Sequence, residues 1–283
     1  MLTVLESITL STEYLKNKGI ESPRINAELL LANILNCKRL NLYLLFDRPL
    51  ADEEVARYRE LLKRRSKFEP LQYIIGNVEF YGLDLYVNPS VLIPRPETEL
   101  LVESIIEIYK DHDPVNILDI GTGSGNIAVS LAKNISNSYI TAVDISDAAL
   151  KTAKENAVLN KVDNKIDFIQ TDFLKDNLNF SEFDVVVSNP PYISISDYET
   201  LRPELTMYEP KGALTDHNSG YLFYEVISSR AYNILKQNGK LFFEIGKDQH
   251  SEVTRIIRSN KFENITIRKD YQNIERVISG EKI

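Results

Sequence analysis

From residue 115 onwards, short β-prone runs alternate with helical patterns, and this alternation restricts the possible fold more than any other feature. The predicted strands are Asn116–Ile120, Tyr139–Asp144, Lys165–Gln170, Asp184–Ser188 and Lys240–Ile245. The helical patterns between and after them cover residues 125–134, 147–160, 219–237 and 248–259. Strands that are joined through helices pair in parallel, so this part of the chain predicts an α/β fold with a doubly wound sheet.

Two more β-prone runs, Asn264–Arg268 and Arg276–Ser279, lie near the C-terminus without a helical pattern between them. Consecutive strands with so short a connection pair antiparallel, and such strands commonly sit at the edge of a parallel sheet. We therefore expect a mostly parallel sheet of seven strands, with this pair at one edge.

The chain before residue 93 has a different character and predicts two further regions. Residues 1–70 carry four short helical patterns and no strand pattern, which predicts a separate N-terminal helical domain, and we expect it to dock the substrate. Residues 71–92 are β-prone and predict a β-hairpin linker that turns at Gly76-Asn77. The sheet domain then covers residues 93–283.

Local signals place several helix starts. The pattern Thr3-x-x-Glu6 predicts a capping box at the first helix, and Ser22-Pro23 predicts an N-cap followed by proline at the first helical position. Pro96 predicts a third helix start, because proline is favoured in the first turn of a helix.

Composition limits the partners and the compartment. The formal net charge of −8 at pH 7 argues against a protein that mainly grips a phosphate backbone, so we expect no direct nucleic-acid partner. A single cysteine, Cys37, and three widely separated histidines predict neither an intrachain disulfide nor a metal site. The sequence has no signal-peptide pattern and no apolar run of about 18 residues, which predicts a cytoplasmic protein without membrane contact. We expect a monomer.

The predicted strand Asp184–Ser188 stops abruptly at Asn189-Pro190-Pro191-Tyr192. Proline has no N–H and cannot extend a central strand, so the chain leaves the sheet at the carboxyl end of this strand, where open α/β sheets bind ligands. The Asn189 side-chain oxygen and the Pro190 carbonyl are two acceptors that suit a planar –NH2 group. Tyr192 can lie on the flat face of that group. The motif has no nucleophile and no general base, which indicates catalysis by orientation and dipoles, whereas a plain Pro-Pro turn is the alternative.

A glycine-rich turn, Gly121-Thr122-Gly123-Ser124-Gly125, follows the first predicted strand of the sheet and opens a helix. Such a turn lets the backbone approach a nucleotide ligand closely. The dinucleotide fingerprint G-x-G-x-x-G would place a glycine at position 126, where this chain has asparagine. The spacing therefore favours an adenosyl ligand without phosphates over a pyrophosphate cofactor.

Two acidic residues follow the next strands of the sheet. Asp144 ends the second strand, about 20 residues after the glycine turn, where an acid accepts hydrogen bonds from ribose hydroxyls. Its alternative role, the N-cap of the next helix, is better suited to Ser146 or Asp147. Asp172-Phe173 follows the third strand and could bind the amino group and the face of adenine, the alternative being a turn acid beside a core aromatic residue.

This order of motifs resembles that of class I S-adenosylmethionine-dependent methyltransferases, in the branch that methylates amino groups and carries Asn-Pro-Pro-Tyr. Further segments extend the resemblance to one family, and they occur in the family's order. They are the segments at residues 69–76, 92–99, 187–193 and 208–214. The whole chain resembles the PrmC/HemK family, the peptide chain release factor glutamine methyltransferases, although Asn273 stands where that family has glycine.

The resemblance implies a Rossmann-like methyltransferase sheet, S-adenosyl-L-methionine as the cofactor, and class 1 peptide chain release factors as the protein partner. The acceptor would be the glutamine of their Gly-Gly-Gln motif. The residues expected in catalysis are Asn189, Pro190 and Tyr192, and Pro191 joins them in substrate binding. The residues expected to bind the cofactor are Gly121, Thr122, Gly123, Ser124, Gly125, Asp144, Asp172, Phe173 and Asn189.

Two alternatives remain at the level of the sequence. Asn-Pro-Pro-Tyr alone also suits enzymes that methylate adenine in DNA or guanine in rRNA, although the charge of −8 disfavours them. A non-catalytic α/β binding module is the second alternative. It would bind partners without transferring a methyl group.

Overall fold

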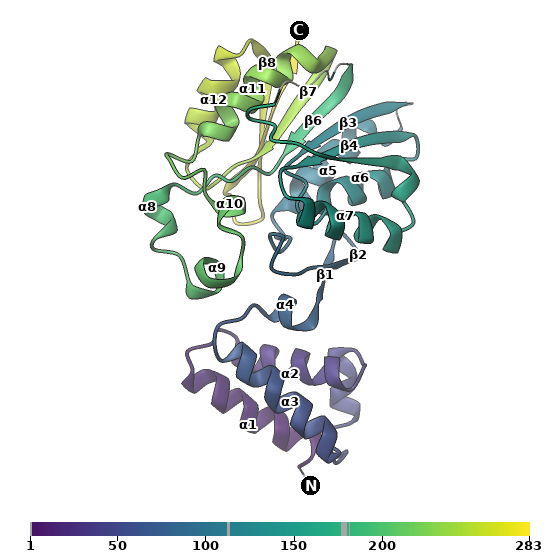
Figure 1. The fold of residues 1–283 in the computed structure, drawn as a ribbon, viewed down its shortest axis with the longest axis vertical. Coiled ribbons are helices and arrows are strands. Elements are labelled where there is room, and N and C mark those ends of the chain that lie inside the picture. The colour runs from purple at the N-terminus through teal and green to yellow at the C-terminus, as the bar shows by residue number, and fades with distance from the viewer. Residues whose placement is uncertain (1, 112–113, 177–179, 181) are drawn as a thin grey trace. The chain divides into compact units, whose positions relative to one another are not determined.

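A computed structural model describes residues 2–111, 114–176, 180 and 182–283. Over these residues the chain forms two compact units, each with its own hydrophobic core (Figure 1). The helical unit consists of Met1–Gly76 together with Arg202–Tyr208. The sheet unit consists of Asn77–Leu201 and Glu209–Ile283.

The helical unit is built from short helices, and those within residues 1–76 bury apolar side chains in one core. The helices are α1 (Val4–Asn17), α2 (Pro23–Ile34), the 3-10 helix η1 (Arg39–Leu44), α3 (Asp52–Arg65), α4 (Leu71–Ile75) and α9 (Pro203–Tyr208). Tyr58 of α3 is buried in this core, and its hydroxyl donates to the carbonyl of Ala27 at 2.9 Å. The buried phenol therefore keeps a hydrogen-bond partner.

The first two helices test the predicted caps. Thr3 forms the predicted capping box: its Oγ1 accepts from the amide of Glu6 at 3.2 Å, and the Glu6 carboxylate accepts from the Thr3 amide at 2.8 Å. Pro23 begins α2 as predicted, but Ser22 makes no side-chain cap. The backbone of Ser22 is left-handed, with φ of 47°, whereas a capping side chain needs the extended backbone of a normal N-cap.

Helix α9 is distant in sequence from the other helices of its unit but is joined to them by an ion pair. The guanidinium of Arg65, which is 4% exposed, forms an ion pair with Glu204 of α9. The same guanidinium donates to the side-chain oxygen of Asn26 at 2.6 Å and to the carbonyl of Glu69 at 3.1 Å. A buried charge is tolerated only with such partners, so residues 202–208 complete this unit.

The predicted hairpin exists, but its turn lies elsewhere. Strands β1 (Asn77–Phe80) and β2 (Leu83–Tyr86) pair antiparallel around Tyr81-Gly82, so the predicted turn at Gly76-Asn77 is wrong. Gly76 instead ends α4 with φ of +90°, a position at which glycine is also favoured. The β-prone residues of α4 are helical because the tertiary contacts of buried Tyr73 and Ile74 outweigh their weak strand preference.

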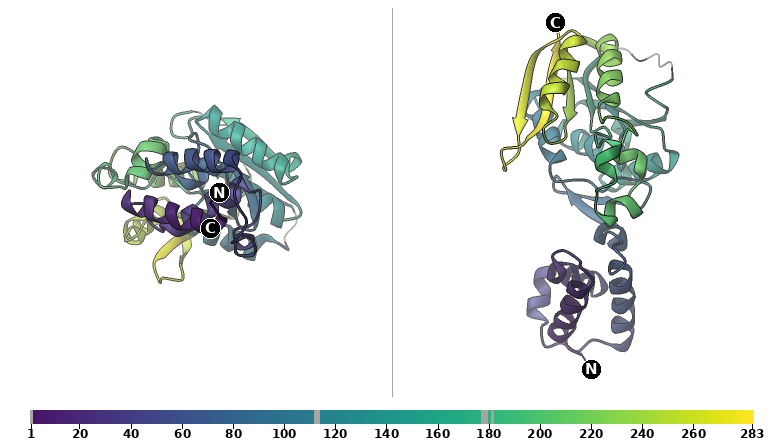
Figure 2. Two further views of the ribbon diagram at one scale, coloured as in Figure 1. Left: turned by 90° about the horizontal axis from the view of Figure 1, so that it is seen from below. Right: turned by 90° about the vertical axis from the view of Figure 1, so that its left-hand side faces the viewer.

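The sheet unit confirms the predicted mostly parallel, seven-stranded sheet. Its strands are β3 (Val115–Ile120), β4 (Ser138–Asp144), β5 (Ile166–Gln170), β6 (Phe183–Ser188), β7 (Leu235–Glu244), β8 (Phe262–Lys269) and β9 (Glu275–Lys282). Their order is β5-β4-β3-β6-β7-β9-β8, with the first five strands parallel. The last two pair antiparallel, as expected, and form the yellow edge in the right-hand view of Figure 2.

Helices cover both faces of this sheet (Figure 1). Side chains alternate along each strand, so Ile117 and Val185 point to one face while Leu118 and Val186 point to the other. The first face packs against α5 (Thr98–Tyr109), α6 (Asn126–Asn134) and α7 (Asp147–Leu159). The second packs against α11 (Leu222–Ile234) and α12 (His250–Ser259). The central strands are therefore buried on both sides, which explains their continuous apolar sequences.

The chain reverses direction across the sheet between β3 and β6. From β3 it proceeds outward to β4 and β5, and it then returns to β6 on the other side of β3. At this switch point the hydroxyl of Ser188 donates to the carbonyl of Ile120 at 2.7 Å. The two strands therefore end side by side, and a crevice at their carboxyl ends is the expected ligand site.

Two local features differ from expectation. Helix α5 begins at Thr98, and Pro96 lies in the turn before it, where its carbonyl accepts from the amide of Glu99 at 3.1 Å. Between β6 and α11 the chain also forms α8 (Ile195–Tyr198), α9 and α10 (Lys211–Leu214). Helices this short contain too few turns to produce a recognisable apolar period.

Candidate active site

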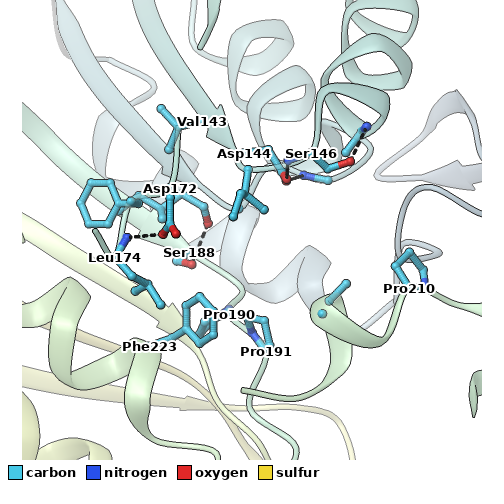
Figure 3. Close-up of a pocket in the computed structure, with 18 of the residues that line it drawn as sticks. Val143, Asp144, Ser146, Asp172, Leu174, Ser188, Pro190, Pro191, Pro210 and Phe223 are labelled. Atoms are coloured by element: carbon cyan, nitrogen blue, oxygen red, sulfur yellow. Dashed lines mark hydrogen bonds between the residues drawn. The ribbon is translucent and has the colours of Figure 1, made fainter. Parts of the chain in front are cut away.

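A pocket of about 490 Å³ lies at the carboxyl ends of β3, β4, β5 and β6, entirely within the sheet unit. The predicted residues that line it are Gly121, Gly123, Asp144, Asp172, Phe173, Asn189, Pro190 and Pro191. In Figure 3, Asp144 and Ser146 lie on one side of the pocket, and Pro190, Pro191 and Phe223 lie across from them. The fold thus brings four separate sequence motifs to one cavity.

The glycine turn forms one wall of this pocket through its backbone. The amide of Gly121 donates to the carbonyl of Val143 at 2.8 Å, which ties the turn to the end of β4. Gly125 ends the turn with φ of +79°, and a Cβ there would lie 3.0 Å from the Cβ of Ala153 in α7. Glycine is therefore required both by the backbone conformation and by the close approach of the two helices.

Thr122 and Ser124 are buried behind the wall instead of lining it. The Thr122 hydroxyl donates to Asp119 Oδ2 at 2.7 Å, and the Ser124 carbonyl accepts from the Asn156 side chain at 2.8 Å. Burial raises the pKa of Asp119 to about 7, although the Thr122 hydrogen bond lowers it. These residues determine the shape of the turn, and direct contact of their side chains with a cofactor remains a prediction.

Asp144 is held at the pocket with its carboxylate directed by backbone amides. Its Oδ2 accepts from the amide of Gly123 and its Oδ1 from the amide of Ser146, both at 2.9 Å. Ser146 fills the N-cap of α7, because its hydroxyl oxygen accepts from the amide of Ala149 at 3.2 Å. Burial raises the pKa of Asp144, and the two amides oppose that effect. Each carboxylate oxygen keeps a lone pair, so the group can still accept hydrogen bonds from a ligand.

Asp172 and Phe173 occupy the turn and core positions that are the alternative to a role in ligand binding. Asp172 accepts from the amide of Leu174 at 3.0 Å and pairs with Lys175 at 3.0 Å, so it stabilises its own turn. Phe173 is 7% exposed within the core beneath α11, with the guanidinium of Arg230 centred 5.7 Å from its ring. Both residues also line the pocket, and their contact with adenine stays a prediction.

Asn189 is oriented by a residue outside the predicted set. Its Nδ2 donates to Thr98 Oγ1 at 3.2 Å, and Thr98 Oγ1 donates to Glu244 Oε2 at 2.6 Å. The side-chain oxygen of Asn189 is thereby left available to accept a hydrogen bond. Thr98 lies in the segment at residues 92–99 that carried the resemblance, but no local pattern revealed its contact with β7.

Tyr192 does not line the pocket, although the structure describes it fully. Its hydroxyl donates to Glu244 Oε1 at 3.3 Å, and its carbonyl accepts from Gln249 Nε2 at 2.9 Å. Burial raises the pKa of Glu244 to about 7. Hydrogen bonds from Thr98 and Tyr192 oppose this shift. A carboxylate at the end of an apolar strand is the signal that could have identified Glu244, as it identified Asp144.

A buried ion pair supports another wall. Glu209, which is 6% exposed, pairs with Arg95 at 2.5 Å and accepts from the amide of Ile93 at 3.2 Å. This pair joins the segment before α5 to the segment that continues into Pro210 and α10, and Pro210 lines the pocket. Arg95 therefore has a structural role that the sequence did not assign.

Two other kinds of feature, a metal site and a membrane-spanning helix, are absent from the described residues. These residues contain no group of three or more His, Cys, Asp or Glu side chains that could hold a metal ion, and His112 lies outside them. No helix within the same residues is long and apolar enough to span a membrane.

Family models match most of this architecture. Residues 6–76 match the PrmC N-terminal domain, and residues 96–204 match the methyltransferase small domain. A release factor glutamine methyltransferase from Fusobacterium nucleatum is 42% identical over 280 residues, which is 98% of this chain and 78% of that relative. The chain belongs to the release factor glutamine methyltransferase family. A family member from Flavobacterium psychrophilum is 44% identical over 246 residues, 85% of each chain.

Solved structures support the fold of this family member. A methyltransferase from Pyrococcus furiosus matches with a TM-score of 0.53 at 17% identity, covering 72% of this chain and 90% of that one. The hMettl16 catalytic domain in complex with MAT2A 3'UTR hairpin 6 matches with a TM-score of 0.58 at 17% identity, covering 82% of each. The predicted family and the Rossmann-like methyltransferase fold are both confirmed, and the chain is a methyltransferase.

Proposed function

We propose that this chain transfers a methyl group to the side-chain amide nitrogen of the glutamine in the Gly-Gly-Gln motif of class 1 peptide chain release factors. The observation that carries the proposal is the orientation of Asn189 at the pocket, in a chain of this family. Its amide nitrogen is bonded to Thr98, so its oxygen is the atom available to a substrate –NH2 group. The relatives' name supports the same acceptor.

The methyl donor in this proposal is S-adenosyl-L-methionine, and the residues at the pocket fit it. A turn of three glycines lets a ligand approach the backbone, and the Asp144 carboxylate keeps lone pairs for ribose hydroxyls. Phe173 supplies an aromatic surface for adenine, with Asp172 beside it. When bound, S-adenosyl-L-methionine supplies an electrophilic methyl group on a sulfonium.

The protein's own contribution is to hold the glutamine amide. Amide nitrogen is a weak nucleophile because its lone pair is delocalised into the carbonyl group. Asn189 Oδ1 and the Pro190 carbonyl accept the two amide hydrogens and favour positive charge on the nitrogen. The sequence predicts that the ring of Tyr192 packs on the amide, but Tyr192 does not line the pocket, so its part in this proposal is to support the site through Glu244. Orientation of this kind contributes up to about 7–11 kcal/mol. The N–H proton is lost late, to solvent or to a carbonyl.

The remaining expectations form part of the same proposal. Residues 1–70 dock the release factor, residues 71–92 connect this domain to the catalytic domain, and residues 93–283 carry the chemistry. The enzyme acts as a monomer in the cytoplasm, where release factors work, and it needs no nucleic acid for methyl transfer.

The decisive experiment follows labelled methyl from S-adenosyl-L-methionine to a purified class 1 release factor. A release factor whose Gly-Gly-Gln glutamine is replaced by alanine is the matched control. Label on the first and none on the second supports both the reaction and the acceptor. Label on both would discard the acceptor, and label on neither, with label on naked DNA or rRNA, would establish methylation of a nucleic-acid base instead.

A further inference from the structure

A hydrogen-bond chain behind the pocket connects Glu244 to two residues of the Asn-Pro-Pro-Tyr motif. Glu244 ends β7 and is 1% exposed. One carboxyl oxygen accepts from Thr98, which in turn accepts from Asn189, over distances of 2.6 and 3.2 Å. The other carboxyl oxygen accepts from the hydroxyl of Tyr192 at 3.3 Å. One buried group thus reaches both side chains through its two oxygens.

When Glu244 is ionised, its charge determines which group donates and which accepts in each hydrogen bond of this series. A carboxylate only accepts, so the single proton of the Thr98 hydroxyl must point to Glu244. The lone pairs of Thr98 Oγ1 then face Asn189, and they can be satisfied only by the Nδ2 end of its amide. The two ends of an asparagine amide have nearly the same shape, so a hydrogen-bond network of this kind decides which end faces the pocket.

We propose that Glu244 and Thr98 are positioning residues that keep the acceptor end of the Asn189 amide turned toward the substrate –NH2 group and hold the Tyr192 side chain in place behind the pocket. The inference rests on the proposed function for the identity of that group. Neither Thr98 nor Glu244 touches the substrate, because this series of hydrogen bonds acts through Asn189 and Tyr192. A reversed Asn189 amide would present its own N–H donors to a substrate that also offers donors.

Protonation of Glu244 removes the constraint on the orientation of the Asn189 amide. A protonated carboxyl can donate to Thr98 Oγ1, and the Thr98 hydroxyl is then free to donate to Asn189 Oδ1, which favours the reversed amide. Burial raises the pKa of Glu244 to about 7, so this change falls within an accessible pH range. The groups that face Glu244 are Thr98, Tyr192, Tyr224, Arg276 and Glu97. Of these, Arg276 favours the charged form and Glu97 opposes it.

The test compares isosteric variants of the full-length enzyme. Thr98→Val removes the hydroxyl and keeps the shape, Thr98→Ser keeps the hydroxyl, and Glu244→Gln removes the charge. The controls are Thr254→Val and Glu225→Gln, because neither of these side chains lines the pocket. Turnover on the release factor is measured from pH 6 to 9, and cofactor affinity is measured by calorimetry.

We expect Thr98→Val and Glu244→Gln each to lower kcat by about 10- to 100-fold, as expected for loss of a hydrogen bond to a charged group, with cofactor Kd changed less than about twofold. Thr98→Ser should retain most of the turnover. The wild-type enzyme should lose activity below about pH 7, and this acid limb should be absent from Glu244→Gln. Wild-type turnover in Thr98→Val, or an unchanged acid limb in Glu244→Gln, would overturn the inference.

A second readout does not depend on the acceptor. The side-chain NH2 resonances of Asn189, assigned by comparison with Asn189→Asp, should shift with a midpoint near pH 7 in the wild type and stay constant in Glu244→Gln. An Asn189 resonance that does not titrate in the wild type would refute the proposed coupling between Glu244 and Asn189. Failure of the wild-type enzyme to methylate the release factor would refute the proposed function alone, because the resonance is measured without substrate.

Discussion

The two ends of the Asn189 side-chain amide have different partners. One end of its amide is bound within the protein by Thr98, and the other end is left for the pocket. We expect Asn189→Ala to lower kcat far more than it lowers cofactor affinity, because the amide acts on the acceptor nitrogen. Steady-state kinetics and calorimetry on the same preparation check this expectation. Equal losses in both quantities would show that Asn189 mainly supports the cofactor.

Gly125 lies where the backbone has a positive φ and where helix α7 packs closely. Gly125→Ala would place a Cβ at 3.0 Å from Ala153 on a backbone with φ of +79°. Strain of this kind costs about 1–3 kcal/mol and deforms the glycine turn. We expect weaker cofactor binding and a lower free energy of unfolding, measured by calorimetry and urea titration. Gly19→Ala is the control, because its φ is +76° but its added Cβ meets nothing within 4 Å. Equal effects of the two substitutions would show that packing against α7 is unimportant.

The sequence predicts those site residues whose chemistry is local. Asp144 and Asn189 directly follow apolar strands, so their position at the carboxyl edge follows from the strand pattern itself. Thr98 and Glu244 are separated by 146 positions, and only the folded sheet brings them into contact. Their pairing could not be predicted from one sequence, because nothing local distinguishes a buried partner from a solvated one.

At the scale of elements, the apolar strands and long helices of the sheet unit were predictable, whereas short segments were not. The central strands β3 and β6 are buried on both faces, and this burial produces the continuous apolar runs that predicted them. Helix α4 carries β-prone residues yet is helical, and α8 and α10 have four residues each. In such short elements tertiary contacts outweigh intrinsic preference.

The ion pair of Arg95 and Glu209 joins two of these irregular segments and offers a test. Arg95→Met removes the cation from the buried Glu209 carboxylate, which keeps the hydrogen bond from the Ile93 amide. Breaking one side of a buried pair costs about 3–5 kcal/mol, so we expect a marked loss of stability in urea unfolding. The double variant Arg95→Met with Glu209→Met should recover part of the loss. An undiminished loss in the double variant would assign the effect to packing of the Arg95 stem.

At the scale of the whole molecule, two buried carboxyls predict how stability depends on pH. Burial raises the pKa of both Asp119 and Glu244 to about 7 from their ordinary values of 3.8 and 4.5. The folded protein then binds more protons than the unfolded chain between about pH 4 and 7. The free energy of unfolding should therefore fall as pH rises through this interval, as far as these two groups determine it.

The rise in the pKa of Glu244 from 4.5 to about 7 corresponds to about 3 kcal/mol of this pH dependence. Glu244→Gln removes the contribution of this carboxyl to the pH dependence. We therefore expect the free energy of unfolding of the variant, relative to that of the wild type, to increase by up to about 3 kcal/mol between pH 5 and pH 8. Urea titrations of both proteins at the two pH values measure it. A constant difference between the two proteins would mean that Glu244 does not titrate on unfolding. Activity should thus rise over the same interval in which wild-type stability falls.

The assignment of α9 to the helical unit has a consequence for how this protein can be divided. A fragment that ends at Gly76 would contain the guanidinium of Arg65, 4% exposed, without the carboxylate of Glu204. An exchange of residues 1–76 alone would therefore separate Arg65 from its ion-pair partner. A functional exchange between relatives would have to transfer residues 202–208 together with residues 1–76, so both stretches are expected to change together during evolution.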